Sequence, residues 1–267
     1  MPERVAITGA TGYLGSALSA MFLSAGWSVL ALSRHKPSLP GITWHHWSLG
    51  TPLAPEVLVD TKYVIHCAYD RQPPSSPASW QVNVEGSRQL FAQLSTTNRL
   101  ILISSIAAQP NLKQRYGSHK YAIEQLALAH GGMAIRPGLI IGTPLGGILA
   151  NLANLSTVPI LPLPAATAVQ YLTSMDALCN HIWSIVNAPT WSPQSTTIVT
   201  QGPISMQALL RQLRPSIPVI IPVPWRPVWL LLVILETMGF KPPLSADSLY
   251  GLATTQYSPS LPLSPSD

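Results

Sequence analysis

Charged side chains are scarce in this chain. Lys, Arg, Asp and Glu together make up 9% of its 267 residues, against about 25% in an average soluble protein. The net charge of +5 arises because there are only 10 acidic residues against 15 basic ones. The basic residues are scattered and form no stripe, so the sequence gives no support for nucleic acid binding. We expect no nucleic acid partner.

Cysteines and long apolar runs are also few. Cys67 and Cys179 are the two cysteines, and they offer neither a disulfide framework nor metal-ligand spacing. His45 and His46 point to opposite faces of an expected strand, so we expect no metal site. The longest apolar run, residues 228–235, is too short to cross a bilayer. No signal peptide pattern precedes the first expected strand, which favours a cytoplasmic protein.

The apolar residues that are present suffice for a large core. They make up 47% of the chain, which argues against disorder. The length suits one large α/β domain with a small appended lobe.

The opening stretch carries the strongest local pattern. Residues 5–7 predict a strand, residues 14–25 predict a helix, and three glycines lie between them at G-x-x-G-x-x-G spacing. Gly9 allows a tight turn, Gly12 lets phosphates approach the backbone, and Gly15 allows close packing of helix on strand. This arrangement puts a pyrophosphate on a helix N-terminus, although an ordinary glycine-rich turn has the same spacing.

The residues after the second expected strand (27–32) bear on the cofactor. An Asp or Glu there would bind the adenosine ribose and favour NAD. This chain has Ser33 and Arg34, followed by His35 and Lys36. A hydroxyl and cations suit a 2′-phosphate, so we expect NADP rather than NAD. The alternative is a solvated basic turn.

Tyr116 and Lys120 lie four residues apart on an expected helix, so both side chains can point into one site. A free tyrosine, with a pKa of about 10, is a poor acid or base at neutral pH. A nearby ammonium favours the phenolate and lowers that pKa. Ser105, at a neighbouring strand end, is our choice for a hydroxyl that holds the substrate oxygen, with Ser104 as the fallback. Alone, such a Tyr/Lys pair is often coincidental.

The other expected elements follow from periodicity and turn residues. Further strands are expected at 42–47, 63–67, 100–103, 133–135, 169–172, 196–200 and 215–224. Further helices are expected at 79–95, 116–129, 174–187, 205–213, 225–240 and 245–252. Residues 158–164 predict a proline-rich loop.

Taken in order, these motifs resemble the short-chain dehydrogenase/reductase superfamily, in its extended, NAD(P)-dependent epimerase/dehydratase-like branch. The segments that carry the resemblance are 8–15, Arg34, 66–68, 83–86, 104–105, Tyr116 with Lys120, 136–138 and 170–178. The resemblance implies an α/β, Rossmann-like fold, with helices on both faces of a doubly wound parallel sheet. It implies an NAD(P)-binding core over 1–142 and a small substrate lobe over 143–256 that is interleaved with late core elements. Residues 257–267 are expected to be a disordered tail.

The resemblance also assigns roles to single residues. Tyr116 would be the acid/base for hydride transfer, Lys120 would lower its pKa and hold the nicotinamide ribose, and Ser105 would orient the substrate. The expected cofactor-binding residues are Gly9, Thr11, Gly12, Tyr13, Leu14, Gly15, Ser33, Arg34, Cys67, Ala68, Asn83, Lys120 and Pro137.

These features predict an NADP-dependent oxidoreductase or epimerase that acts on a hydroxyl/carbonyl pair. Residues 137–210 contain no Lys or Arg, so a small, weakly polar substrate is favoured over a nucleotide sugar, whose diphosphate needs cations. Two alternatives stay open: a nucleotide-sugar epimerase/dehydratase, and a non-catalytic NAD(P)-binding protein similar to accessory subunits of respiratory complexes. Residues 225–240 suit core packing, a peripheral membrane contact or a partner contact. The chain is expected to be a monomer or a homodimer.

Overall fold

The computed structural model of the chain describes residues 2–71, 77–110, 114–146, 149–150, 160–213, 219–240 and 242–254. The predicted disordered tail, 257–267, lies outside these residues.

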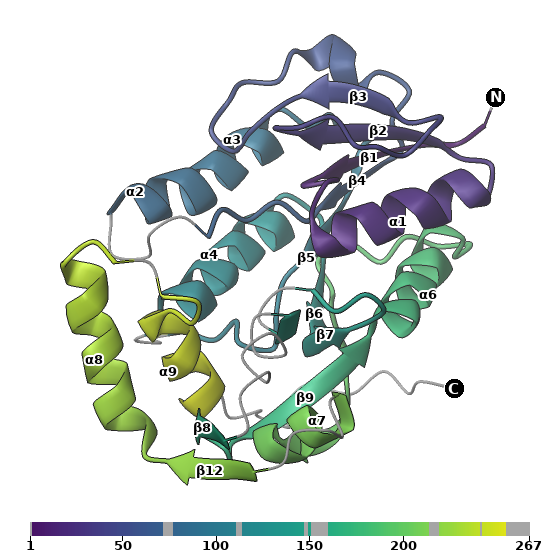
Figure 1. Ribbon diagram of the computed structural model, residues 1–267. Helices are drawn as coiled ribbons and strands as arrows, with labels where there is room; N and C mark the ends of the chain where they lie inside the picture. The colour runs from purple at the N-terminus through teal and green to yellow at the C-terminus, as the bar shows by residue number, and fades with distance from the viewer. Residues whose placement is uncertain are drawn as a thin grey trace.

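A seven-stranded parallel sheet forms the centre of the molecule (Figure 1). Its strand order is β10-β6-β5-β4-β1-β2-β3. The strands span Arg4–Thr8 (β1), Ser28–Ser33 (β2), Thr43–His46 (β3), Tyr63–His66 (β4), Arg99–Ile103 (β5), Met133–Pro137 (β6) and Thr196–Val199 (β10). The order reverses direction at β1, which neighbours both β2 and β4. The predicted Rossmann-like, doubly wound fold is confirmed.

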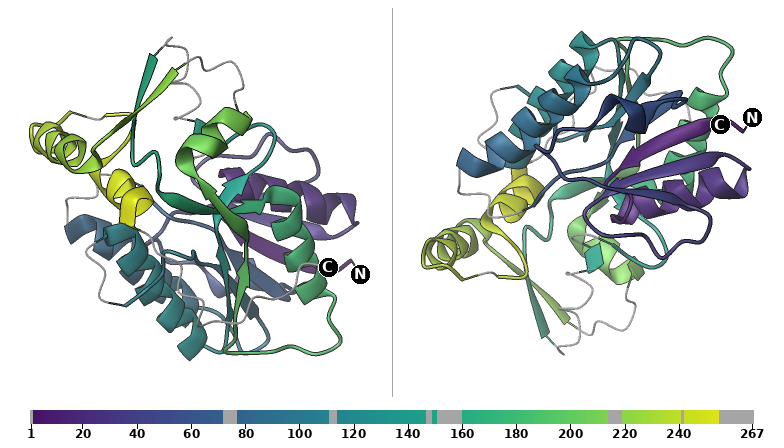
Figure 2. Two further views of the ribbon diagram at one scale, coloured as in Figure 1. Left: turned by 90° about the horizontal axis from the view of Figure 1, so that it is seen from below. Right: turned by 90° about the horizontal axis from the view of Figure 1, so that it is seen from above.

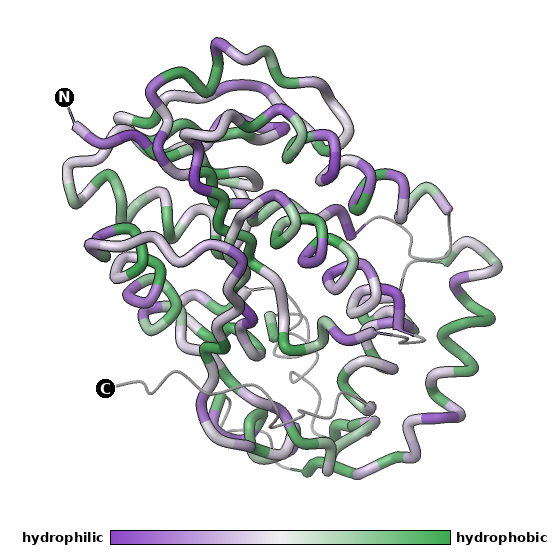
Figure 3. Tube along the Cα trace, turned by 180° about the vertical axis from the view of Figure 1, so that it is seen from behind, coloured by the Kyte–Doolittle hydropathy of each residue, from purple (hydrophilic) through white to green (hydrophobic). Residues whose placement is uncertain are grey.

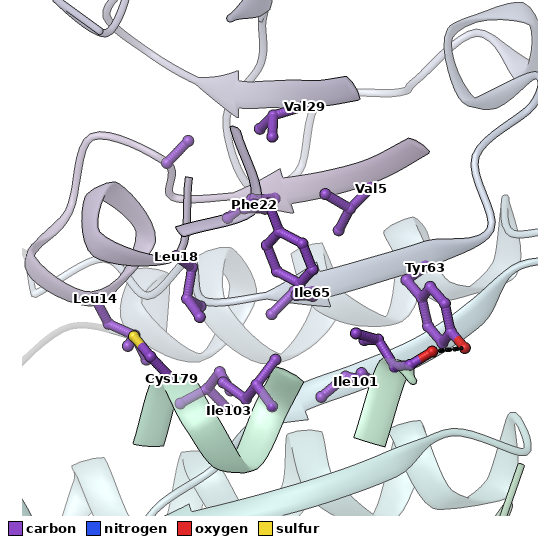
Figure 4. Packing of buried hydrophobic residues seen from close by; sticks show 14 of the residues in the cluster. Val5, Leu14, Leu18, Phe22, Val29, Tyr63, Ile65, Ile101, Ile103 and Cys179 are labelled. Atoms are coloured by element: carbon purple, nitrogen blue, oxygen red, sulfur yellow. Dashed lines mark hydrogen bonds between the residues drawn. The ribbon is translucent and has the colours of Figure 1, made fainter. Parts of the chain in front are cut away.

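Helices cover both faces of this sheet (Figure 2). One face carries α1 (Tyr13–Ser24) and α6 (Met175–Val186), and the other carries α3 (Gly86–Ala92) and α4 (Arg115–Ala129). Because both faces are covered, the central strands read as nearly continuous apolar runs. Figure 4 shows the α1 side of the core, where Phe22 packs near Ile65 and the Tyr63 hydroxyl donates to the Val186 carbonyl at 2.9 Å.

Within the ranges that the structure describes, the smaller lobe contains two small sheets and three helices with defined bounds. The first sheet joins β7 (Leu139–Ile141), β9 (Val169–Ser174) and β11 (Gln201–Ser205), and the second joins β8 (Ile160–Pro164) and β12 (Val219–Val223). The helices are α7 (Met206–Leu213), α8 (Trp225–Thr237) and α9 (Ala246–Thr254). Helix α6 and strand β10 belong to the central core although they come between lobe elements in the sequence.

The prediction of a loop at 158–164 was wrong for its described part, residues 160–164. These residues form β8, which pairs in parallel with β12. Proline lacks a backbone N–H and is tolerated only on edge strands, and both strands of a two-stranded sheet are edges. Leu161 and Leu163 point into the lobe core, whereas Ile160 is exposed.

The segment 79–95, expected to be one continuous helix, is divided into three parts in the structure. It consists of α2 (Pro77–Trp80), a π-helical turn (Gln81–Glu85) and α3. Strands β7 and β11 were not predicted, because one has only three residues and the other contains Gly202 and Pro203, which disfavour strands.

Candidate active site

The glycine loop lies at the carboxyl ends of β1 and β4, where the strand order reverses. Gly9 has a φ of +67°, a left-handed conformation that favours glycine. A Cβ on Gly15 would overlap the Gly9 carbonyl oxygen. The Gly12 N–H donates to that same oxygen at 2.8 Å. Gly9 therefore allows the tight turn that the sequence predicted, and Gly15 lets the helix pack closely on that turn rather than on the strand.

The N-terminus of α1 suits a bound phosphate. Gly12 is the N-cap, and no side chain of a described residue caps the helix there. The first N–H groups of a helix need partners and carry a partial positive charge, so the Tyr13 and Leu14 backbone fits a pyrophosphate. The Leu14 side chain itself packs in the core, whereas Thr11 is exposed beside the turn.

Two further residues border this loop. A Cβ on Gly9 would come within 3.0 Å of the Ala68 backbone, so Cys67 and Ala68, two of the expected cofactor-binding residues, lie against the loop. Burial raises the pKa of the Cys67 thiol to about 12, which excludes a thiolate near neutral pH. The Tyr13 hydroxyl is buried without a hydrogen-bond partner among the described residues. A Cβ on Gly142 would come within 2.7 Å of this oxygen, so the hydroxyl lies against the segment that follows β7.

A chain of buried polar groups links β1, β4 and α3 behind the loop. The Ser87 hydroxyl donates to the Asn83 carbonyl at 2.6 Å, so it must accept from His66 Nε2, 2.9 Å away. His66 Nδ1 is then an acceptor for the Thr8 hydroxyl at 2.8 Å, and Thr8 Oγ1 accepts from the Ala68 N–H at 3.1 Å. With the donors and acceptors arranged in this order, all of these hydrogen bonds can form only when the His66 ring is neutral.

Electrostatics favour the same state of His66. Burial, together with the nearby Lys120 ammonium, lowers the His66 pKa to about 3. The ring is therefore a fixed structural connector near neutral pH. In the sequence, His66 stands out only as the first residue of the 66–68 motif.

The predicted specificity residues, Ser33 and Arg34, lie at the end of β2. Ser33 is buried and donates to the His35 carbonyl at 2.7 Å. The Arg34 side chain is 59% exposed, and its Nη1 lies 3.4 Å from a carboxylate oxygen of Asp70. Asp70 follows β4 and lies 36 residues after Arg34 in the chain. The residues just after β2 therefore give no indication that it lies there.

The side-chain amide of Asn83 holds two neighbouring backbone segments in place, at Asp70 and at Ser79. Its Oδ1 accepts from the Asp70 N–H at 2.7 Å, and its Nδ2 donates to the Asp70 carbonyl at 2.9 Å. Nδ2 also donates to the Ser79 carbonyl at 3.0 Å. The buried amide therefore holds the backbone that follows β4, a segment that borders the glycine loop.

Tyr116 and Lys120 lie on one side of α4. The Lys120 ammonium lies 5.9 Å from the centre of the Tyr116 ring. It donates to the Ile103 carbonyl at the end of β5, at 2.8 Å, and is almost fully buried. The β5 strand end thus fixes the cation beside the phenol.

The structure distinguishes the two candidate serines. Ser104 is buried, and its hydroxyl donates to Glu124 Oε2 at 2.6 Å. Glu124 is in turn held by Arg136, whose Nη2 lies 2.6 Å from the other carboxylate oxygen. The Ser105 hydroxyl accepts from the Ala107 N–H at 3.2 Å and donates to no acceptor among the described residues, so its hydrogen can be donated to a substrate. Ser105 is therefore the better candidate.

Pro137 ends β6 close to this site. Its carbonyl accepts from the Ile106 N–H at 3.0 Å, so the segment after β5 is tied to the end of β6. A Cβ on the next residue, Gly138, would overlap the Tyr171 carbonyl oxygen of β9. Glycine is needed there for the lobe sheet to approach the core.

A row of aromatic contacts that was not predicted runs from Tyr116 through Tyr69 and His119 to Trp80. The Tyr69 ring meets the Tyr116 ring edge-on at 5.1 Å, and its hydroxyl lies 3.2 Å from His119 Nδ1. His119 packs in turn against Trp80 at 5.3 Å. Burial raises the pKa of Tyr69, which keeps that phenol protonated. The feature of the sequence that could have identified Tyr69 as a site residue is its position just after the strand β4.

No group of His, Cys, Asp and Glu side chains within the described ranges could hold a metal ion. Among the helices that the structure describes, none is long and apolar enough to span a membrane.

Comparisons with known proteins agree with this geometry. Residues 5–136 match the model of the NAD dependent epimerase/dehydratase family. A ceramide reductase of Caulobacter vibrioides is 31% identical over 175 residues, which cover 61% of this chain and 55% of that protein. An uncharacterized protein of Mycobacterium tuberculosis is 26% identical over 220 residues, 77% of this chain but 22% of that protein. The chain therefore spans only part of the length of these curated relatives.

Solved structures share the fold. MoeE5, solved with UDP-glucuronic acid and NAD, is 18% identical, with a TM-score of 0.68 over 94% of this chain and 97% of that one. TunA, an NAD dependent NDP-hexosamine 5,6-dehydratase, is 20% identical, with a TM-score of 0.66 over 83% and 84% of the two chains.

Proposed function

We propose, from the match of residues 5–136 to the NAD dependent epimerase/dehydratase family, that the chain is an NADP-dependent oxidoreductase or epimerase of the short-chain dehydrogenase/reductase type. It acts on a hydroxyl/carbonyl pair of a small, weakly polar substrate. The observation that carries this proposal is the buried Lys120 ammonium beside the Tyr116 ring, at the same edge of the sheet as the glycine loop.

The residues at this edge fit a dinucleotide. The backbone of residues 12–14 would hold the pyrophosphate at the start of α1, Arg34 would pair with the 2′-phosphate, and Lys120 would contact the nicotinamide ribose. A bound nicotinamide supplies the hydride donor or acceptor. The exposed ion pair of Arg34 with Asp70 is weak, so a phosphate, which carries more charge and more acceptor oxygens, can replace the carboxylate.

The chain's own residues move the proton. In oxidation, the Tyr116 phenolate removes the proton of the substrate hydroxyl, and in reduction the Tyr116 phenol protonates the carbonyl oxygen. Lys120 stabilises the phenolate electrostatically. Ser105 donates a hydrogen bond to the same substrate oxygen and orients it. An epimerase would repeat the transfer on the opposite face of the carbonyl.

The surroundings of Tyr116 favour a weakly polar substrate over a nucleotide sugar. The Tyr69 ring packs edge-on against Tyr116, and His119 and Trp80 extend this aromatic row beyond Tyr69. Residues 137–210 supply no cation for a diphosphate. The name of the Caulobacter relative, a ceramide reductase, supports a lipid-like ketone or alcohol. The sugar nucleotides in the names of the structural neighbours support the alternative of a nucleotide-sugar epimerase/dehydratase.

The exposed face of α8 favours a peripheral membrane contact through residues 225–240. Leu230, Leu231 and Ile234 are each about half exposed, and Met238 and Phe240 just after the helix are more exposed still. Such a stripe suits an interfacial helix, and it would bring the enzyme to a lipid-like substrate.

The decisive experiment compares Tyr116→Phe with Tyr121→Phe. We expect Tyr116→Phe to lose at least about 100-fold in turnover, because the acid/base hydroxyl is gone, with the NADPH dissociation constant unchanged. Tyr121, the next tyrosine on α4, is the matched control and should retain wild-type turnover. Candidate ketones and alcohols are screened by NADPH absorbance. Unchanged turnover in Tyr116→Phe would contradict the mechanism, and failure of the wild type to bind any dinucleotide would favour a role without NADP(H).

A further inference from the structure

The first turn of α4 has an unusual cap. Tyr116 is the second residue of this helix, whose N-cap, Gln114, has an extended backbone and makes no side-chain cap bond. The first N–H groups of a helix require acceptors from elsewhere. In α4 the acceptor comes from a distant part of the chain.

Asp247 of α9 provides that acceptor. Its Oδ1 accepts from the Arg115 N–H at 2.9 Å, and its Oδ2 accepts from the Tyr116 N–H at 3.2 Å. The Arg115 Nε lies 3.9 Å from Oδ1. The carboxylate is largely buried, with 13% of the side chain exposed. A carboxylate at this point also interacts favourably with the helix dipole.

Helix α9 is itself held in place by α8, its neighbour in Figure 1. Glu236 Oε1 accepts from the Ala246 N–H at 2.8 Å, at the start of α9. The Trp225 and Trp229 rings pack on Tyr250, with centroids 5.8 and 6.2 Å away. The position of the carboxylate therefore depends on the α8–α9 pair.

We propose that Asp247 is a positioning residue for Tyr116. This inference rests on the proposed function, in which Tyr116 is the acid/base. The carboxylate accepts a hydrogen bond from the Tyr116 backbone N–H. It therefore fixes the backbone at Tyr116, and with it the direction in which the side chain points. Lys120 lies one turn further along and is held independently by the Ile103 carbonyl. Loss of the carboxylate should displace the phenol while the ammonium stays in place.

The test uses Asp247→Ala, Asp247→Asn and a matched control, Ser174→Ala. Ser174 caps α6 by accepting from the Ala177 N–H at 3.1 Å, so its loss also removes a helix cap but far from Tyr116 in the sequence. Hydrogen exchange of the Arg115 and Tyr116 amides, the NADPH dissociation constant and turnover are measured for each variant.

We expect Asp247→Ala to raise amide exchange at residues 115–116 about fivefold, the effect of losing a typical cap. We expect kcat to fall about 10-fold or more, as displaced catalytic groups do, with NADPH affinity within about twofold of wild type because Lys120 is unmoved. Asp247→Asn keeps an acceptor oxygen and should restore most of kcat. Ser174→Ala should lower thermal stability with unchanged exchange at 115–116 and unchanged kcat.

Two results would overturn the inference. One is wild-type amide exchange at residues 115–116 in Asp247→Ala. The other is a kcat in Asp247→Ala no lower than in Ser174→Ala. If the wild-type chain binds no dinucleotide, the proposed function fails, whereas the exchange measurement still decides whether Asp247 positions Tyr116.

Discussion

Arg34 and Asp70 together determine the expected cofactor preference at the scale of single residues. Arg34 is the cation available to a 2′-phosphate at the end of β2, and Asp70 lies 3.4 Å from it. The carboxylate would repel that phosphate and could instead accept from the ribose hydroxyls of NAD. The two side chains thus act in opposite directions on the choice between NADPH and NADH.

We predict that Arg34→Asp lowers NADPH affinity about 10-fold or more while NADH affinity changes little, because a charge-assisted contact is lost. Asp70→Asn should raise NADPH affinity several-fold. Fluorescence titration with both cofactors measures these effects, and Arg88→Asp, an exposed cation on α3, is the control. Equal affinities of the wild type for NADPH and NADH would contradict the assignment of NADP.

Helix α8 carries three exposed large apolar side chains, Leu230, Leu231 and Ile234. Its side chains alternate between those that pack on α9, such as Trp229, and those that face outward, such as Leu231 and Ile234. Figure 3 shows the hydrophobic colouring continuing along most of the helix. The inner face packs α8 on α9, whereas Leu231 and Ile234 on the outer face stay about half exposed to solvent among the residues that the structure describes.

We predict that the Leu231→Asp/Ile234→Asp double variant loses binding to vesicles with anionic lipid headgroups, because charge on the apolar face opposes insertion. The control is Val59→Asp, a similarly exposed apolar residue beside the central sheet. Co-sedimentation with vesicles and light scattering are measured together. Unchanged vesicle binding would exclude the membrane contact, and a concentration-dependent dimer lost in the double variant would identify a protein interface instead.

The buried His66 network affects the stability of the whole molecule, because it joins two central strands to α3. Its folded-state pKa of about 3 lies below the ordinary value of 6.5, so the unfolded chain binds the proton more readily. The stabilisation is fully present above pH 6.5 and is lost as the pH falls toward 3. The slope for one such group approaches about 1.4 kcal/mol per pH unit.

We predict that His66→Gln reduces the dependence of the unfolding free energy on pH between 6.5 and 4, because the titrating group is removed. His35→Gln, at an exposed position, should leave that dependence unchanged. Urea unfolding at several pH values measures both. An NMR titration that finds His66 protonated in the folded protein near pH 6 would contradict the prediction.

Local patterns were enough to predict most of the central fold. The strand–glycine–helix pattern of residues 5–25 and the spacing of Tyr116 and Lys120 predicted the loop and the paired side chains, since backbone sterics and helix periodicity act within a few residues. Strand β8 could not be predicted in this way, because its prolines are tolerated only through its pairing with β12.

The amino-acid sequence by itself determined the Rossmann-like core, the dinucleotide loop and the candidate catalytic pair. Only the tertiary structure brought Asp70 to Arg34, directed the Ser104 hydroxyl to Glu124 and placed Asp247 on the first turn of α4. These contacts join residues that are 36, 20 and 131 positions apart. No local periodicity encodes them, because they depend on how separate elements pack against one another.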